Sequence, residues 1–138
     1  MNKTGKLDDK ELEELRKFFD NDHFAMNAGC RIDEAGSGWS VCSMEVTDAH
    51  RNAFGMIMGG AMVTLADFAA AVIGNRPGKY TTANSVTTTF VGNTKSDKIF
   101  ANAVLKRDGR STNYIEVEIT DDKGKQLARG TVLGCRLS

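Results

Sequence analysis

A long apolar segment with a single charge limits how this chain can fold. Between Arg51 and Arg76, 24 residues contain one charged side chain, Asp67. Residues 59–75 read GGAMVTLADFAAAVIGN, and their continuous apolar runs are shorter than the ~20 residues of a membrane span. A helix that is apolar on nearly every face has to be surrounded by other elements. We therefore expect a buried helix, starting near Gly59, in a soluble protein.

The rest of the sequence predicts one surface helix and six strands. Residues 8–20, DDKELEELRKFFD, repeat apolar side chains at helical spacing, and Asp8 and Glu11 are placed for a capping box. Strand patterns cover residues 24–36, 38–48, 81–91, 98–107, 112–120 and 125–138, with turn signals at 34–38, 108–109 and 121–124. Short strands joined by tight turns favour an antiparallel sheet that wraps the apolar helix.

Composition excludes several classes of protein. The 138 residues fit one domain, and 18 basic residues balance 18 acidic ones, so no positive excess points to nucleic acid. Cys30, Cys42 and Cys135 lack the spacing of disulfide frameworks or zinc sites and predict buried free thiols in a reducing cytoplasm. The polar, acidic start of the chain is unlike a signal peptide. Neither His23 nor His50 has a metal-ligand partner, so we expect no metal.

Glycines come directly before the apolar helix, at Gly55, Gly59 and Gly60. A helix that begins near Gly59 leaves its first N–H groups without helical partners, at the positive end of its dipole. Such an end binds a carboxylate, a phosphate or a developing oxyanion. The alternative, of equal weight from the pattern alone, is that these glycines only let the helix pack closely on the sheet.

Asp67 has two interpretations. It can be a polar residue on a water-facing strip of the helix, or one bonded to a nearby Ser or Thr. Alternatively, burial raises the pKa of the carboxyl toward the range of a general base. Gly59 and Asp67 are eight residues apart, roughly 12 Å along one helix at ~1.5 Å per residue. Joint action on one carbonyl therefore requires a dimer with antiparallel helices.

The spacing of these residues resembles a family motif, Asn-x-x-Gly-x-x-His-Gly-Gly-x-x-x-x-Leu-x-Asp. Its positions here are Asn52, Gly55, Met58, Gly59, Gly60, Leu65 and Asp67. The motif is that of hotdog-fold acyl-CoA thioesterases, in the branch of phenylacetyl-CoA and related medium-chain thioesterases. The resemblance covers about residues 20–138. It implies an α+β hotdog fold, an antiparallel β-sheet wrapped round one long central α-helix with a short N-terminal helix. Residues 1–138 would form one domain, with 1–22 as a helical extension and 23–138 as the core.

The resemblance also assigns roles to the motif residues. Asp67 would be the general base or nucleophile, and the Gly59 N–H would form the oxyanion hole across a dimer interface. Asn52 would place the thioester carbonyl or the attacking water. Met58 stands where the family has histidine, and methionine cannot donate a strong hydrogen bond. The departure implies either a lower activity or a more apolar acyl pocket at Met58.

Other residues are expected to bind the substrate. Gly60 belongs to the same turn as Gly59, and His50 comes two residues before Asn52, although a loop histidine often makes a structural hydrogen bond. The family carries a hydroxyl near the start of the strand after the helix, here Ser85, with Asn84 and nearby threonines as alternatives. Phosphates of CoA require cations; the candidates are Lys106, Arg107 and Arg110, with Arg76 and Lys79 after the helix. Solvated surface charge is the alternative for each of these cations.

We therefore expect hydrolysis of a small or medium acyl-CoA, aryl-acyl-CoA included, to the free acid and CoA, without metal or cofactor. Composition and sequence pattern predict a cytoplasmic protein that binds neither nucleic acid nor membrane, and the resemblance implies a homodimer that pairs into a homotetramer. Met58 leaves open an alternative, a hotdog protein that binds an acyl-CoA or aryl ligand without hydrolysing it. A third reading, a hydratase or dehydratase, needs a histidine paired with the carboxylate. The spacing of His50 does not match that motif.

Overall fold

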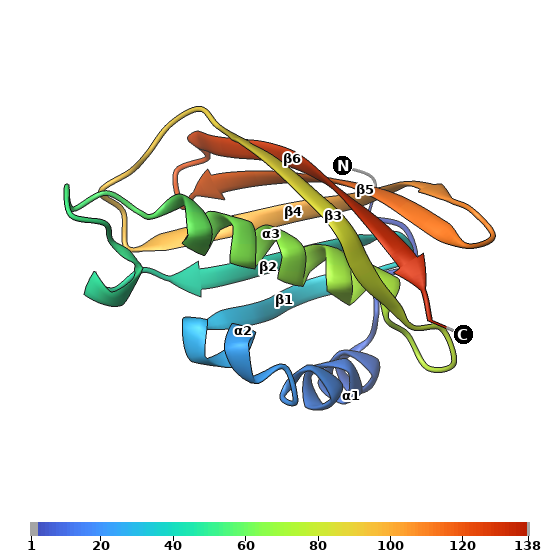
Figure 1. Ribbon diagram of the computed structural model, residues 1–138. Coiled ribbons are helices and arrows are strands. Elements are labelled where there is room, and N and C mark those ends of the chain that lie inside the picture. Colours follow the sequence, from blue (N-terminus) through green and yellow to red (C-terminus); the bar gives the residue numbers. More distant parts are fainter. Residues whose placement is uncertain (1–2, 138) are drawn as a thin grey trace.

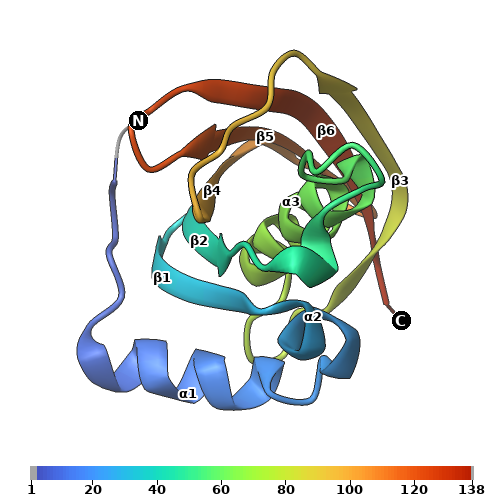
Figure 2. The same cartoon turned by 90° about the vertical axis from the view of Figure 1, so that its left-hand side faces the viewer.

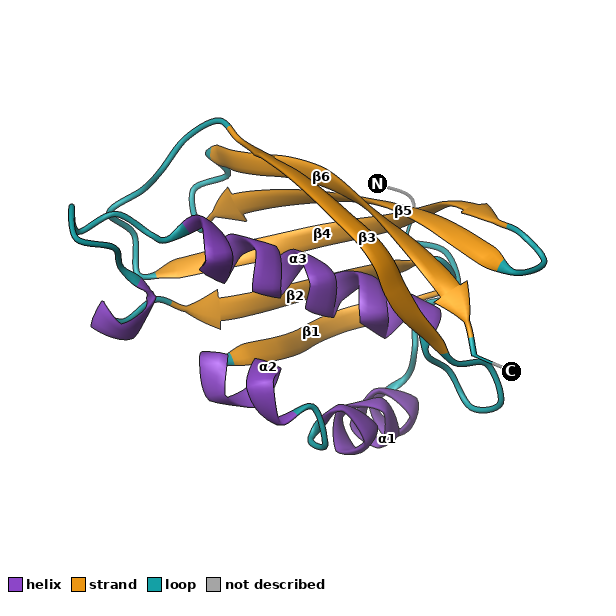
Figure 3. Ribbon diagram, in the orientation of Figure 1, coloured by secondary structure: helices purple, strands orange, loops and turns teal. Residues whose placement is uncertain are grey.

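One antiparallel sheet curves around a single long helix in the computed structural model, which describes residues 3–137 (Figures 1 and 2). The six strands follow the order β1-β2-β4-β5-β6-β3. Along the chain, two short helices and two strands precede the long helix, and four consecutive strands follow it (Figure 3). Their bounds are α1 Asp9–Phe19, α2 His23–Ala28, β1 Cys30–Gly36, β2 Trp39–Glu45, a 3-10 helix η1 Asp48–His50, α3 Gly59–Gly74, β3 Thr81–Phe90, β4 Lys98–Asp108, β5 Thr112–Asp121 and β6 Gln126–Arg136. The predicted architecture, an antiparallel sheet around a long helix with a short N-terminal helix, is confirmed.

Helix α3 is the centre of the hydrophobic core. Leu65, Ala69 and Val72 have no exposed surface, as the apolar composition of this segment predicts. The sheet supplies the other half of the core through alternation, because Ile115, Val117 and Ile119 of β5 are at most 3% exposed while Glu116 and Glu118 point outward. Burial of each large apolar side chain contributes about 1.5–3 kcal/mol.

The prediction of a strand beginning at residue 24 is wrong. Residues 23–28 form the short helix α2, and β1 starts at Cys30. The side chain of Asp22 caps this helix by accepting a hydrogen bond from the Ala25 N–H (3.4 Å). Gly29 then ends it in the left-handed conformation (φ +90°), which favours glycine.

Helix α1 packs beside β1 and next to the end of α3 (Figure 2). The predicted capping box is present, since the Glu11 N–H donates to Asp8 (2.8 Å) and the Asp8 N–H donates to Glu11 (3.1 Å). Phe19 lies edge-on against Phe68 of α3, with ring centroids 5.5 Å apart. Phe18 stacks on Tyr80 at 5.7 Å. These aromatic contacts hold the α1–α2 connection over one side of α3.

Strand β3 is the last strand of the sheet and pairs only with β6 among the described residues. Most of its side chains are exposed. Such an edge presents unpaired backbone N–H and C=O groups to a further strand.

Three smaller predictions concern the rest of the chain. All three cysteines are free thiols, as expected, and Cys30 and Cys42 are buried, but the predicted burial of Cys135 is wrong because this residue is partly exposed. Within residues 3–137 no helix is both long and apolar enough to cross a membrane. The predicted boundary between a helical extension (1–22) and the hotdog core (23–138) stays a prediction. Positions 1, 2 and 138 of the predicted domain lie outside the described residues.

Candidate active site

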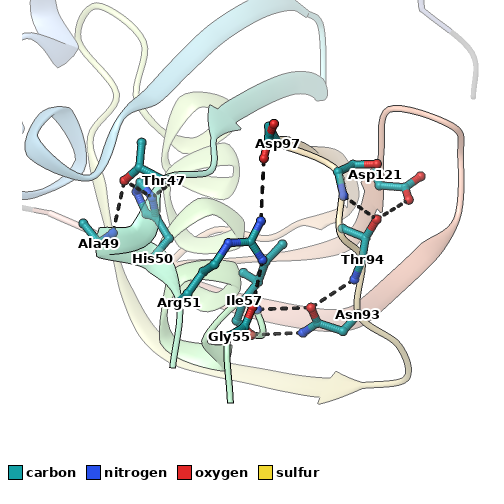
Figure 4. Close-up of polar contacts among 11 residues, drawn as sticks. Thr47, Ala49, His50, Arg51, Gly55, Ile57, Asn93, Thr94, Asp97 and Asp121 are labelled. Carbon is teal, nitrogen blue, oxygen red and sulfur yellow. Dashed lines mark hydrogen bonds and ion pairs between the residues drawn. The ribbon is translucent and has the colours of Figure 1, made fainter. Parts of the chain in front are cut away.

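The loop before α3 is held by side chains of the segment that follows β3 (Figure 4). Arg51 donates to the Gly55 carbonyl (3.0 Å) and lies 3.7 Å from the Asp97 carboxylate. Asn93 binds Ile57 twice, accepting from its N–H (3.1 Å) and donating to its carbonyl (3.0 Å). Residues from two separate parts of the chain thus fix the path of the backbone into α3.

A second set of contacts anchors this segment to the sheet. The Thr94 hydroxyl donates to the Asp121 carboxylate (2.7 Å) at the end of β5 (Figure 4). The other oxygen of Asp121 accepts from the N–H groups of Lys123 and Lys125, each at 2.9 Å. The start of α3 is therefore positioned relative to the sheet rather than left on a loose loop.

Asn52 shapes the loop with its side-chain oxygen. This oxygen accepts from the N–H of Phe54 (2.9 Å) and of Met56 (3.1 Å), around a turn in which Gly55 has φ +77°. Within residues 3–137 its amide nitrogen Nδ2 donates to no acceptor, so that nitrogen is the part of Asn52 left for a ligand. The predicted role of Asn52 in placing the thioester stays a prediction.

The two glycines at the start of α3 differ in their surroundings, and the anion-binding role of this helix end stays a prediction. A Cβ on Gly59 would lie 2.7 Å from the ring of Phe90, so this glycine lets α3 approach β3 closely. A Cβ on Gly60 would meet nothing within 4 Å, so close packing does not require the second glycine. Met58 is the N-cap residue and makes no side-chain cap bond. In the described chain neither Gly59 nor Gly60 donates its N–H to an acceptor, which leaves two donors at the positive end of α3.

His50 uses both ring nitrogens for structural contacts. Its Nδ1 accepts from the Thr47 N–H (2.9 Å), which assigns the ring proton to Nε2, and Nε2 donates to the Ala28 carbonyl (2.6 Å). The histidine therefore fastens the 3-10 helix η1 to the end of α2. This is the structural alternative expected for a loop histidine, and His50 does not line the cavity beside Asp67.

Asp67 opens onto a cavity of about 460 Å³ between α3, β3 and the α1–α2 connection. Apolar walls come from Phe19, Ala70, Ile115 and Val132. Within the described chain no group hydrogen-bonds to the Asp67 carboxylate, so the interpretation of a carboxylate bonded to Ser or Thr is wrong. The carboxylate is free to contact a ligand or a water molecule in the cavity.

Two effects raise the pKa of Asp67 above its ordinary value. The larger is desolvation by partial burial, and the smaller is the negative charge of Asp22, which lines the same cavity. A carboxyl with a raised pKa is a stronger base once ionised. The ionised Asp67 carboxylate is therefore a stronger base than a solvent-exposed aspartate.

Ser85 is not brought to this cavity. The pairing of β3 with β6 shifts between Ala83 and Ser85, a bulge that changes which side chains point inward. Before the bulge Ala83 lines the cavity, and after it Val86 packs against the core. Ser85 shares the outward side with Thr87. Thr81 and Thr82, two of the alternative threonines, do line the cavity.

The predicted phosphate-binding cations lie at or near the β4–β5 hairpin, the orange loop at the right of Figure 1. Lys106 pairs with Glu116 at 3.8 Å, while Arg107 and Arg110 are exposed. None of the three lines the Asp67 cavity. Their role toward CoA stays a prediction.

Asp22 and Asn113 are among the cavity residues that were not identified from the sequence. Asp22 is 45 residues before Asp67, and only the fold of α1 and α2 brings them together. The sequence does contain a signal for Asn113, because this residue is in the same alternating, inward-facing series as Ile115, Val117 and Ile119. A polar residue at an inward position of a strand is a reason to look for a site. Among residues 3–137 no three His, Cys, Asp or Glu side chains gather to hold a metal ion; the predicted absence of metal and cofactor stays a prediction.

Comparison with known proteins identifies relatives of this chain. Residues 54–128 match the family model described as the thioesterase superfamily. The chain is 28% identical over 120 residues to acyl-coenzyme A thioesterase PaaI of Escherichia coli (strain K12), covering 86% of each chain. It is 31% identical over 117 residues to a putative esterase of Archaeoglobus fulgidus, covering 83% of this chain and 76% of the relative. The structure of the E. coli PaaI protein from the phenylacetic acid degradation operon superposes with a TM-score of 0.85 at 25% identity, covering 94% of both chains.

The matched residues include the start of α3 and Asp67, the two features on which the resemblance to hotdog thioesterases depends. The family match confirms the expectation of a thioester hydrolase, and the superposition confirms the hotdog fold. The chain belongs to the thioesterase superfamily, in the hotdog-fold branch that includes E. coli PaaI.

Proposed function

We propose that this protein hydrolyses the thioester of a small or medium acyl-CoA, aryl-acyl groups included, to the free acid and CoA. The observation that carries the proposal is Asp67, a partly buried carboxylate that faces a cavity and accepts no hydrogen bond within residues 3–137. The relationship to the E. coli acyl-coenzyme A thioesterase supports the choice of substrate class.

In the proposed reaction Asp67 removes a proton from a water molecule as that water attacks the thioester carbonyl carbon. The carbonyl oxygen gains negative charge and accepts hydrogen bonds from the free N–H of Gly59, at the positive end of α3. Breaking the C–S bond releases the CoA thiolate, which takes the proton from Asp67. In the nucleophilic variant, Asp67 attacks the carbonyl itself, and water then hydrolyses the resulting anhydride.

Two subunits form each site in this proposal. Gly59 and Asp67 lie eight residues apart on α3, which is roughly 12 Å along the axis, so one carbonyl cannot reach both from the same chain. The free edge of β3 offers a surface on which a second sheet can continue. Large apolar side chains are exposed near the start of α3 and the end of β3: Phe54 87%, Met56 47%, Met58 55%, Phe90 50% and Val91 56%. So many exposed apolar side chains in one region favour a surface that a second subunit covers.

The finer expectations belong to the same proposal. Lys106, Arg107 and Arg110 bind CoA phosphates as cations at the end of the sheet. The homodimer pairs again as a homotetramer, and the protein acts in the cytoplasm without metal or cofactor.

The test is a thiol-release assay over a panel of acyl-CoAs with wild type and Asp67→Asn. Because Asp67→Asn removes the proposed general base, we expect kcat to fall at least ~100-fold. The matched control is Asp122→Asn, the same exchange at an exposed turn residue, which should keep wild-type rates.

Met58 supports a second candidate, a protein that binds an acyl-CoA or aryl ligand without hydrolysis, because the family histidine is absent. Saturable binding of acyl-CoAs by a wild type that turns over no member of the panel would establish this candidate and refute the hydrolase.

A further inference from the structure

Asn113 is a buried polar side chain that the proposed hydrolysis does not use. It lies on β5, is 3% exposed, and its Oδ1 has no hydrogen-bond partner among the described residues. Such groups are rare in folded proteins because burial removes the carbonyl from water without replacing its hydrogen bond. Its neighbours Ile115 and Val117 on the inward face of the strand are apolar, so an apolar residue would suit the core better.

The surroundings of Asn113 leave space for its carboxamide. A Cβ on Gly134 of β6 would collide with Oδ1, and a Cβ on Gly74 at the end of α3 would lie 3.3 Å from Nδ2. Asn113 lines the Asp67 cavity and also an adjacent hollow of about 270 Å³ that contains Arg76 and Arg136. The carboxamide therefore forms part of the wall between the two spaces.

The position of Asn113 relative to Asp67 fits the far end of an acyl chain. Gly74, which lies beside the carboxamide, follows Asp67 by seven residues, or two helical turns and about 10 Å. The cavity wall includes the apolar Ala70 and Ile115 as well as the polar Thr81 and Thr82. An acyl group whose carbonyl lies at Asp67 and whose chain follows α3 would reach the Asn113 carboxamide at its far end.

We propose that Asn113 is a specificity-determining residue that binds a hydroxyl group on the acyl chain, remote from the thioester. This inference rests on the proposed acyl-CoA hydrolysis. A hydroxyl both donates and accepts, so it can bind Oδ1 or Nδ2. In the structure Oδ1 faces Gly134, and a half-turn of χ2, a broad two-fold torsion, brings it to the cavity. The preferred substrates are then hydroxylated acyl-CoAs.

The experiment compares hexanoyl-CoA with ω-hydroxyhexanoyl-CoA, and octanoyl-CoA with ω-hydroxyoctanoyl-CoA, in wild type and Asn113→Leu. Leucine has a similar shape without polar atoms. Wild type should prefer the hydroxylated member of at least one pair about tenfold or more in kcat/KM, and Asn113→Leu should reduce the ratio to one or below. Asn27→Leu, the same exchange at an exposed position of α2, is the control and should keep the wild-type ratio.

If the role of Asn113 is purely structural, Asn113→Leu should change kcat/KM equally for both members of each pair. That outcome, or a wild type without preference in either pair, overturns the inference. Asn113→Ala carries the same comparison if the leucine variant does not fold. Dissociation constants of the four acyl-CoAs for the Asp67→Asn protein, with and without Asn113→Leu, are measured by titration calorimetry. They keep the inference testable even if the wild type shows no hydrolysis, because the tenfold preference is then read from binding.

Discussion

Mixing two inactive variants tests whether Asp67 and the start of α3 serve one site from two subunits. Asp67→Asn removes the proposed base. Asn52→Ala removes the oxygen that accepts from the N–H groups of Phe54 and Met56, and so loosens the loop that presents Gly59. Each lost hydrogen bond costs about 1 kcal/mol, and loss of an oxyanion donor lowers kcat by about 10²–10³. Each variant alone should therefore be nearly inactive.

The 12 Å separation of Gly59 and Asp67 along α3 determines what the mixture should do. Random reassembly of equal amounts gives half mixed dimers. In a mixed dimer one site combines Asp67 of one chain with the intact loop of the other, while the second site carries both defects. Since half of the dimers are mixed and each of these has one intact site of two, the mixture should show about a quarter of wild-type activity.

The assay is thiol release after the two variants are dissociated in denaturant together and reassembled. Wild type and each variant, treated alone in the same way, are the controls. A site built within one chain would leave every site in the mixture defective. A mixture no more active than the mean of its components, beside a wild type that recovers, would refute the composite site.

Three further predictions concern charge and packing. Asp22→Asn should move the acid limb of the pH profile of kcat/KM to lower pH, because the Asp22 charge raises the pKa of Asp67 and asparagine still caps α2; an unchanged limb contradicts this. Asp67→Asn should raise Tm at pH 7, since a folded-state pKa above the unfolded value makes the ionised carboxylate destabilising. The gain should vanish on acidification below about pH 3.9, which thermal scans at both pH values measure. Leu65→Ala, at a fully buried position, should cost about 2–5 kcal/mol in urea unfolding, whereas the exposed Lys123→Ala should stay within about 0.5 kcal/mol.

Elements with a local signal were predictable from the sequence. The capping box of Asp8 and Glu11, the start of α3 at Gly59 and the strand alternation around Ile115 all depend on neighbours within a few residues. Helix α2 was mistaken for a strand because its six residues are too few to show a helical period. Its cap at Asp22 and its end at Gly29 are the signals that identify it.

The sequence by itself determined that residues 59–74 would be a buried helix with Asp67 inside it, because one charge in a long apolar segment is a local property. It also indicated the family, through the spacing of six residues that match the seven-position motif. Only the tertiary structure decided that Asp22 faces Asp67, that Asn113 lies two turns along the same cavity, and that Ser85 points away. Contacts between distant residues follow from packing, and a one-residue bulge in β3 reverses which side chains face inward.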